Sequence, residues 1–138
     1  APENMFITLF FGLLDTSSGL LYYANAGHEP PLLWSRKTGR IRSLASTGRA
    51  LGFVGGGEFL CEEAAIEPGD ILVMYTDGVT EARNGGTLFD VSGVRDAVRS
   101  AAGDSAARVA ELIETRAREH AGGRLTDDIA LLVARRRG

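Results

Sequence analysis

The sequence predicts an α+β fold, in which a largely antiparallel β-sheet or β-sandwich has its helices packed outside. Short apolar runs separated by turn residues fill the first 75 positions, and two amphipathic helical patterns follow after position 90. Strands joined by short turns pair antiparallel, and helices with one apolar face must cover a sheet or another helix. With 138 residues, of which 44% are hydrophobic and 24% charged, the chain is expected to form one domain.

Two hairpins are predicted near the start of the chain. Met5–Asp15 is almost continuously apolar, which is typical of a strand covered on both faces, and Leu20–Ala26 follows a polar turn. Leu32–Ser35 and Arg40–Leu44 flank a second turn and form the second hairpin. Two prolines within residues 27–31 exclude a helix or a central strand between the hairpins.

A third hairpin is predicted after the glycine-rich residues 45–57. Glu58–Ile66 and Ile71–Tyr75 flank Glu67–Asp70, whose proline and glycine stand at turn-favoured positions. The glycine-rich stretch does not place a GxGxxG motif between a strand and a helix, so it predicts a surface loop and not a phosphate cradle.

The second half of the chain predicts two helices and a last strand. Asp90 or Ser92 is expected to cap the first helix, and Asp104 or Ser105 the second, which ends at Gly122. Their apolar residues recur at helical spacing and predict one buried face for each helix: Val91, Val94, Val98 and Ala101, then Val109, Leu112, Ile113 and Ala117. In residues 127–134, two carboxylates lead into a final apolar strand.

Composition excludes several classes of function. The formal net charge of −3 argues against a nucleic-acid-binding protein, which needs a basic surface. The single cysteine, Cys61, excludes an internal disulfide and indicates a reducing, cytoplasmic compartment. No apolar run has the length of a membrane span, and the two histidines lack the spacing of a zinc site.

Carboxylates stand at the ends of two apolar strands. Asp77 follows the strand Ile71–Tyr75, whereas Asp127 and Asp128 precede the last strand. If these strands are antiparallel neighbours, the three carboxylates converge at one edge of the sheet, where oxygen ligands favour Mg²⁺ or Mn²⁺. The alternatives are that Asp77 caps a short helix and that Asp127 and Asp128 are a polar loop end.

Four segments, in order along the chain, resemble the catalytic domain of the PPM-type metal-dependent protein serine/threonine phosphatases, in the SpoIIE/RsbU branch. They are residues 4–15, residues 23–32 with Asn-Ala-Gly-His, residues 72–82 with Asp-Gly-Val-Thr-Glu-Ala, and residues 126–133 with Asp-Asp-Ile. The resemblance implies a β-sandwich between helical layers, the α-β-β-α arrangement. It also implies a cluster of Mn²⁺ or Mg²⁺ ions at one end of the sandwich.

The resemblance implies a role for each of several residues of this chain. Asp77 and Asp127 match metal ligands, Asp128 takes the adjacent position, and Gly78 lies with its backbone near the metal. The implied reaction is direct hydrolysis of phosphoserine or phosphothreonine by a metal-activated water. The implied substrates are small proteins of the anti-anti-sigma type.

The chain departs from the family pattern upstream of its first strand. The Gly-Gly-Asp-Phe-Tyr-Asp-like and Gly-Asp-Val-Ser-Gly-like segments, which supply the metal-bridging aspartate in the family, are absent. We therefore expect residues 1–138 to be the C-terminal portion of a single phosphatase domain that holds one metal ion or none. We also expect it to be inactive or nearly so alone, and to homodimerise or dissolve poorly through an unpaired sheet edge.

Other polar residues receive structural interpretations first. His28 is expected to brace its loop, with substrate contact as the second interpretation, and Arg83 to be an exposed arginine or a phosphate contact. Glu81 is interpreted as structural and His120 as a surface residue at a helix end.

The sequence also bears on two other functions. A haloacid-dehalogenase-type phosphatase needs an aspartate nucleophile where Tyr75 stands and a downstream lysine, but no lysine follows Lys37. That alternative is excluded. A non-catalytic domain that binds a partner, with structural carboxylates, remains as the second hypothesis.

Overall fold

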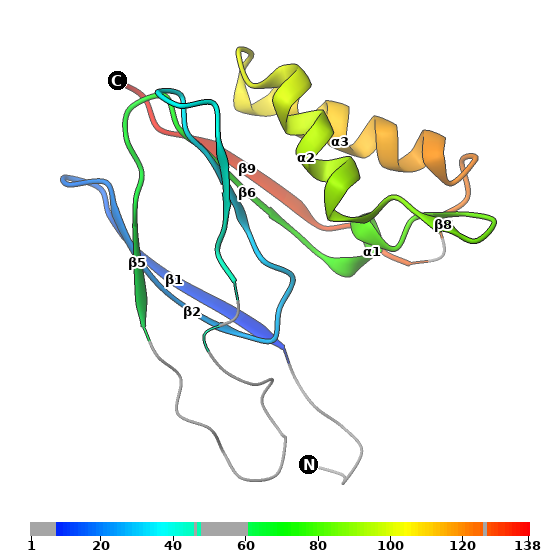
Figure 1. Ribbon diagram of the computed structural model, residues 1–138, viewed down its shortest axis with the longest axis horizontal. Coiled ribbons are helices and arrows are strands. Elements are labelled where there is room, and N and C mark those ends of the chain that lie inside the picture. Colours follow the sequence, from blue (N-terminus) through cyan, green and yellow to red (C-terminus); the bar gives the residue numbers. More distant parts are fainter. Residues whose placement is uncertain (1–7, 46, 48–60, 126) are drawn as a thin grey trace, which may run out of the picture.

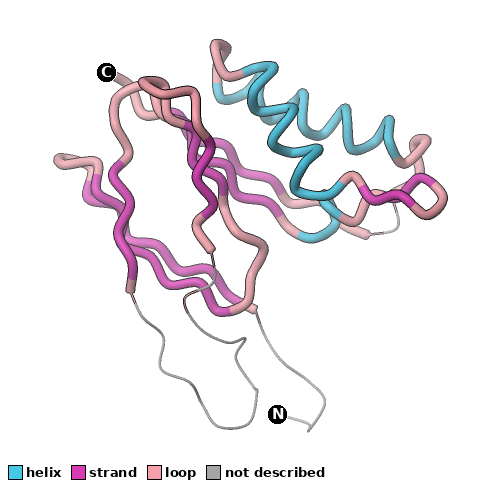
Figure 2. The backbone as a smooth tube through the Cα atoms, in the orientation of Figure 1, coloured by secondary structure: helices cyan, strands magenta, loops and turns pink. Residues whose placement is uncertain are grey.

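The chain forms three layers, comprising two antiparallel β-sheets and a pair of helices that covers one of them (Figure 1). The structure is a computed structural model, which describes residues 8–45, 47, 61–125 and 127–138. The helices lie on the far side of the second sheet from the first, as the backbone tube shows (Figure 2). The predicted α+β class, with a largely antiparallel sandwich and helices outside, is confirmed.

The first sheet has the order β1-β2-β5 and contains the first predicted hairpin. β1 (Leu9–Asp15) pairs antiparallel with β2 (Leu20–Ala26), and β2 pairs antiparallel with β5 (Glu62–Ala65). The Asp15 carboxylate accepts a hydrogen bond from the backbone N–H of Ser17 at 2.9 Å, which fixes the turn between β1 and β2. Residues 5–7 and 58–60 of the predicted strands lie outside the described residues.

The second sheet has the order β4-β3-β6-β9 and contains the second predicted hairpin. β3 (Leu32–Trp34) pairs antiparallel with β4 (Ile41–Ser43) on one side and with β6 (Ile71–Tyr75) on the other. β9 (Leu131–Arg135) pairs antiparallel with β6 at the opposite edge. The two strands with carboxylates at their ends are therefore the antiparallel neighbours on which the predicted site depends.

The predicted third hairpin is wrong. β5 pairs with β2 in the first sheet, whereas β6 pairs with β3 and β9 in the second, so the turn at residues 67–70 passes between sheets. The buried Asp70 holds this turn, since its carboxylate accepts hydrogen bonds from the backbone N–H groups of Arg36 at 3.0 Å and Glu67 at 2.9 Å. Turn residues show where a chain reverses direction, but they do not show which sheet receives the next strand.

The two predicted helices are confirmed, with corrections at the start of the first. α2 (Asp90–Ala101) has Phe89 at its N-cap, so neither Asp90 nor Ser92 caps it. α3 (Ala106–His120) is capped as predicted by Ser105, whose hydroxyl accepts a hydrogen bond from the Arg108 N–H at 3.2 Å. α3 ends where Gly122 and Gly123 take positive φ angles of 65° and 82°.

Two short elements connect β6 to α2. α1 (Asp77–Thr80) follows β6 almost directly, and β7 (Arg83–Asn84) pairs with β8 (Thr87–Leu88) as a small hairpin. The sequence of residues 84–87, Asn-Gly-Gly-Thr, is typical of a loop. Two-residue strands carry too little hydrophobic periodicity to be distinguished from a loop in the sequence.

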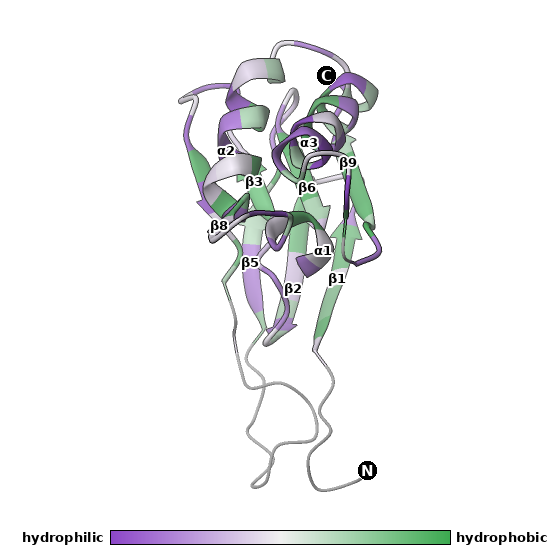
Figure 3. Cartoon of the chain, turned by 90° about the vertical axis from the view of Figure 1, so that its right-hand side faces the viewer, coloured by the Kyte–Doolittle hydropathy of each residue, from purple (hydrophilic) through white to green (hydrophobic). Residues whose placement is uncertain are grey.

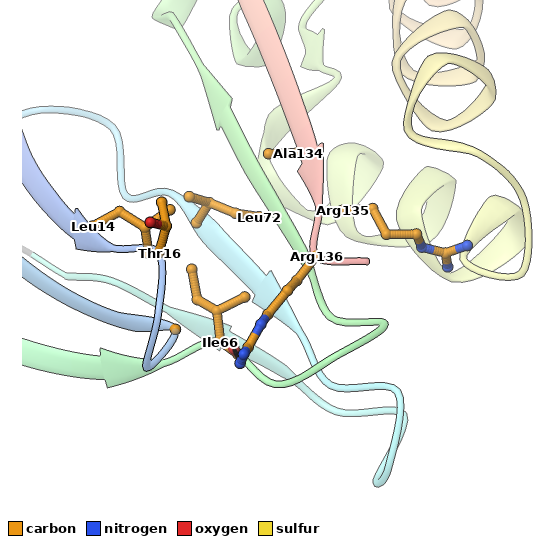
Figure 4. Close-up of a pocket in the computed structure, with 8 residues that line it drawn as sticks. Leu14, Thr16, Ile66, Leu72, Ala134, Arg135 and Arg136 are labelled. Carbon is orange, nitrogen blue, oxygen red and sulfur yellow. Dashed lines mark hydrogen bonds between the residues drawn. The ribbon is translucent and has the colours of Figure 1, made fainter. Parts of the chain in front are cut away.

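Side chains of the second sheet fill both of its interfaces. Toward the helices, Ile71, Val73 and Tyr75 of β6 pack against a buried cluster that includes Val94, Ala97, Val98, Val109 and Ile113. Toward the first sheet, Leu33 packs with Leu21, Tyr23, Leu44, Ala64 and Ile66. A mostly apolar cavity of about 190 Å³ lies beside this second cluster and is lined by residues that include Leu14, Ile66, Leu72 and Arg136 (Figure 4).

The outer face of β1 is exposed, contrary to the prediction of a strand covered on both faces. Phe11 and Leu13 are each 62% exposed, and no described helix covers them. The strand is apolar along its length (Figure 3), and one of its edges is unpaired in the described sheet. An apolar, unpaired edge strand is a site of self-association.

We expect the chain to self-associate through β1. Replacing both Phe11 and Leu13 with threonine should reduce association, because threonine keeps the β-propensity of the strand while removing apolar surface. Light scattering over a range of concentrations measures this. Leu88→Thr, at an exposed position on the β7–β8 hairpin, is the matched control, and a wild-type chain that stays monomeric contradicts the prediction.

Candidate metal centre

The β6–β9 ladder places the ends of two strands side by side. Its last pair is Tyr75 with Leu131, and the contact continues one step further through Thr76. The Thr76 N–H donates to the Ala130 carbonyl at 3.0 Å, and the Ala130 N–H donates to the Thr76 hydroxyl at 3.0 Å. Asp77 therefore begins α1 directly beside the segment that leads into β9.

Gly78 allows an even closer approach. A Cβ atom at this buried position would lie 2.0 Å from the Asp128 carbonyl oxygen and 2.9 Å from its carbonyl carbon. Real Cβ atoms do not approach backbone atoms so closely, so only glycine lets α1 lie against residue 128. The Asp-Gly sequence thus has two functions, because the glycine brings the two chain segments together and the aspartate supplies a carboxylate.

Asp77 is not the cap of α1. Thr76 is the N-cap residue, and Asp77 is the first residue within the helix. The Glu81 N–H donates to the Asp77 carbonyl at 2.8 Å, which is the hydrogen bond of one helical turn. Side chains four positions apart on a helix lie on one face, so this turn brings the carboxylates of Asp77 and Glu81 together.

Three exposed carboxylates converge at this edge of the sheet. Among the described residues, Asp77, Glu81 and Asp127 each offer an oxygen atom, and these atoms all lie within 4.8 Å of one another. Two oxygens bound to one hard cation at about 2.0–2.5 Å are at most about 5 Å apart, so the three residues fit a single divalent ion. Oxygen-only ligands favour Mg²⁺ or Mn²⁺.

The membership of this group differs in part from the predicted site. Asp77 and Asp127 come together as predicted, but Asp128 lies outside the group and lines a groove with Glu111 and Glu114 of α3. Glu81, interpreted from the sequence as structural, takes part instead. The signal that identifies it is its spacing of four residues from Asp77 on a helical turn.

His28 braces the loop after β2, as the first interpretation of this residue predicted. Its backbone N–H donates to the side-chain oxygen of the fully buried Asn25 at 2.8 Å, and its Nδ1 lies 3.0 Å from the Glu29 carbonyl. The Asn25 amide also donates to the Leu44 carbonyl at 3.1 Å. These hydrogen bonds attach the loop to Asn25, and a contact between His28 and a substrate stays a prediction.

Two other predicted surface residues are placed by the structure. Arg83 is exposed on β7, and its contact with a phosphate stays a prediction. His120 lies at the end of α3, but it also contacts the small hairpin. Its Nε2 is 2.9 Å from the Thr87 carbonyl, and its ring is 5.8 Å from that of Phe89.

Glu29 brings a further negative charge to this edge. Burial raises the pKa of the Glu29 carboxyl, and the charges of Asp77 and Glu81 raise it further. The loop that carries it is attached to β6, because the Tyr75 hydroxyl donates to the Pro30 carbonyl at 2.7 Å. Burial also raises the pKa of Tyr75, so this phenol remains a hydrogen-bond donor at neutral pH.

Comparison with known proteins shows the family of the chain. The sequence model of the Stage II sporulation protein E (SpoIIE) family matches residues 1–137. The chain belongs to the SpoIIE family. Its resemblance to PPM-type phosphatases of the SpoIIE/RsbU branch is thereby confirmed, and the family relatives are protein serine/threonine phosphatases.

Individual relatives agree with this assignment. Phosphoserine phosphatase RsbU of Bacillus subtilis is 28% identical over 134 residues, which are 97% of this chain and 40% of RsbU. The crystal structure of the RsbU and RsbW domains of Rv1364c from Mycobacterium tuberculosis is 31% identical, with a TM-score of 0.73 over 94% of this chain and 37% of that one. The chain thus spans less than half of the length of either protein.

A third relative has the same fold and contains metal. The catalytic domain of the serine/threonine phosphatase PstP, solved in complex with two manganese ions, has a TM-score of 0.68 at 16% identity. The alignment covers 96% of this chain and 60% of that structure. No helix among the described residues of our chain is long and apolar enough to cross a membrane.

Proposed function

We propose that the chain is the C-terminal, metal-binding portion of a phosphatase domain that hydrolyses phosphoserine or phosphothreonine on a regulatory protein. The observation that carries this proposal is the convergence of Asp77, Glu81 and Asp127 at the end of the β6–β9 ladder. Membership of the SpoIIE family supports the reaction class. A small protein of the anti-anti-sigma type is the proposed substrate, and a cytoplasmic location stays a prediction.

The proposed ligands of the cation come from two elements of the fold. Asp77 and Glu81 offer their carboxylates from α1, Asp127 offers one from the segment before β9, and Gly78 sets the distance between these two elements. When bound in the intact domain, Mn²⁺ or Mg²⁺ supplies a water of lowered pKa for in-line attack on phosphorus. Asp128, beside Asp127, faces the groove along α3 and lies outside the group of ligands.

Efficient phosphate hydrolysis is proposed to need more of the phosphatase domain than these 138 residues. The bridging aspartate of the family has no counterpart in this sequence, so the chain alone is expected to hold a single ion, at Asp77, Glu81 and Asp127, and to hydrolyse little. Incubating the chain with a phosphoserine protein and Mn²⁺ tests this expectation, and clear Mn²⁺-dependent release of phosphate contradicts it.

A chimera tests the proposed function itself. Replacing the matching C-terminal part of the Bacillus subtilis RsbU phosphatase domain with this chain should preserve metal-dependent hydrolysis of a phosphoserine protein. The same chimera with Asp127→Asn should lose it while keeping its circular dichroism spectrum. A folded chimera that is inactive with Asp127 present contradicts the proposal.

The alternative is a non-catalytic module that binds a partner. The high exposure of the three carboxylates and the missing bridging residue favour this reading of the chain by itself. It predicts that Mn²⁺ does not raise the melting temperature, or that it does so equally in an Asp77→Asn variant.

A further inference from the structure

The loop between β2 and β3 is held against the end of β6 at a defined point. Pro30 accepts a hydrogen bond from the Tyr75 hydroxyl at 2.7 Å, although the two residues are 45 positions apart. Tyr75 is 2% exposed and packs within the core beneath the helices, so its hydroxyl has a fixed position. Asp77, the first residue of α1, follows two residues later in the chain.

Glu29 directly precedes this anchored proline. The other side of the loop is fixed by the contacts of His28 with the Asn25 side chain and with the Glu29 carbonyl. Glu29 is half-buried. Burial raises the pKa of its carboxyl and the charges of Asp77 and Glu81 raise it further, so Glu29 lies within electrostatic reach of these two carboxylates. It is not one of the three residues whose carboxylate oxygens come within 4.8 Å of one another.

Such a carboxylate is costly in the free protein, because it faces two like charges and is partly withdrawn from water. A divalent cation between the ligands removes this cost. Negative charge that is held close to a cation site by the fold stabilises the bound cation without contacting it. The hydrogen bonds of the loop thus keep Glu29 where it disfavours the empty site and favours the filled one.

We propose that Glu29 is a positioning residue of the metal centre, held by the Tyr75–Pro30 hydrogen bond so that its charge strengthens divalent cation binding by Asp77, Glu81 and Asp127. This inference rests on the metal site of the proposed function. It adds a loop from the first half of the chain to a site otherwise built from α1 and the segment before β9.

The test is Mn²⁺ affinity, measured by isothermal titration and by the electron paramagnetic resonance signal of free Mn²⁺. Glu29→Gln is expected to weaken binding about tenfold, the usual effect of residues that support metal ligands. Glu67→Gln is the matched control, since Glu67 is exposed before β6 and roughly 16 Å of strand separates it from the site. Its affinity should equal that of the wild type.

Salt distinguishes a charge effect from a structural one. The difference between wild type and Glu29→Gln should shrink as ionic strength rises from about 0.01 M to about 1 M, where the screening length falls from about 30 Å to about 3 Å. A difference caused by a distorted loop would not change with salt.

Tyr75→Phe tests the anchor. It removes only the hydroxyl that holds Pro30 and should also weaken Mn²⁺ binding. The double variant Glu29→Gln with Tyr75→Phe should bind no more weakly than Glu29→Gln alone, because the anchor acts through Glu29. Additive losses contradict the proposal.

The outcomes separate this inference from the function on which it rests. If Asp77→Asn abolishes Mn²⁺ binding but Glu29→Gln binds as the wild type does, the role of Glu29 is wrong and the metal site stands. If the folded wild-type chain binds no Mn²⁺, the proposed metal site of the chain is wrong, and the proposed role of Glu29 is wrong as well.

Discussion

Replacing Asp77 with asparagine is expected to abolish the stabilisation of the chain by Mn²⁺. Asparagine keeps the shape of the side chain but removes one of three converging negative charges. A ligand at 100 times its dissociation constant raises the free energy of unfolding by about 2.7 kcal/mol, so the wild-type melting temperature should rise clearly with Mn²⁺. That of the variant should not.

Asp104→Asn is the control for this experiment. Asp104 is an exposed residue in the turn between α2 and α3. This turn lies by the end of β9 that is remote from Asp127, because Arg135 donates to the Ala102 carbonyl there. The control should respond to Mn²⁺ as the wild type does. If Mn²⁺ raised the melting temperature of the Asp77→Asn variant as much as that of the wild type, the metal would not bind at α1. That result would favour the non-catalytic module.

The second large effect is expected from Gly78→Ala. The added methyl group would lie 2.0 Å from the Asp128 carbonyl oxygen, so either α1 or the segment before β9 must move. Both are attached to the β6–β9 ladder, and overpacking of this kind costs about 1–3 kcal/mol of stability. Because Asp77 and Asp127 lie on the two sides of this contact, Mn²⁺ affinity should fall as well.

Urea denaturation measures the loss of stability, and Gly86→Ala supplies the comparison. A Cβ at Gly86 meets no atom within 4 Å, so that variant should differ little from the wild type in stability or Mn²⁺ affinity. A Gly78→Ala chain as stable as Gly86→Ala would show that the contact with residue 128 can relax, and that the geometry of the site does not depend on it.

The sequence was sufficient for the parts of the site that depend on local pattern. The apolar runs that became β6 and β9, each with aspartate at one end, predicted that Asp77 and Asp127 meet if the strands pair antiparallel, and they do pair in this way. The helices α2 and α3 were likewise readable from the spacing of residues such as Val94 and Ile113.

Other features depend on contacts between distant parts of the chain. The strand before Glu67 joins the first sheet and not β6, because its partner is β2, about 40 residues earlier in the chain. Glu81 joins Asp77 only once α1 forms, and the loop that carries Glu29 is attached to β6 by the hydrogen bond between Tyr75 and Pro30. Strand patterns cannot predict such tertiary contacts.

The exposed face of β1 has a different cause. Continuous apolarity predicted a strand covered on both faces, but Phe11 and Leu13 are largely exposed. The apolar residues of a strand reflect everything that packs against the strand in the complete domain. In the intact phosphatase domain that we propose, further structure would cover this face.

A crystal of the chain soaked in Mn²⁺ tests the central claim most directly. The anomalous difference map should show a peak among the carboxylates of Asp77, Glu81 and Asp127, about 2.0–2.5 Å from their oxygen atoms. A peak elsewhere, or no peak at these three residues when the soak is saturating, would contradict the proposed metal centre.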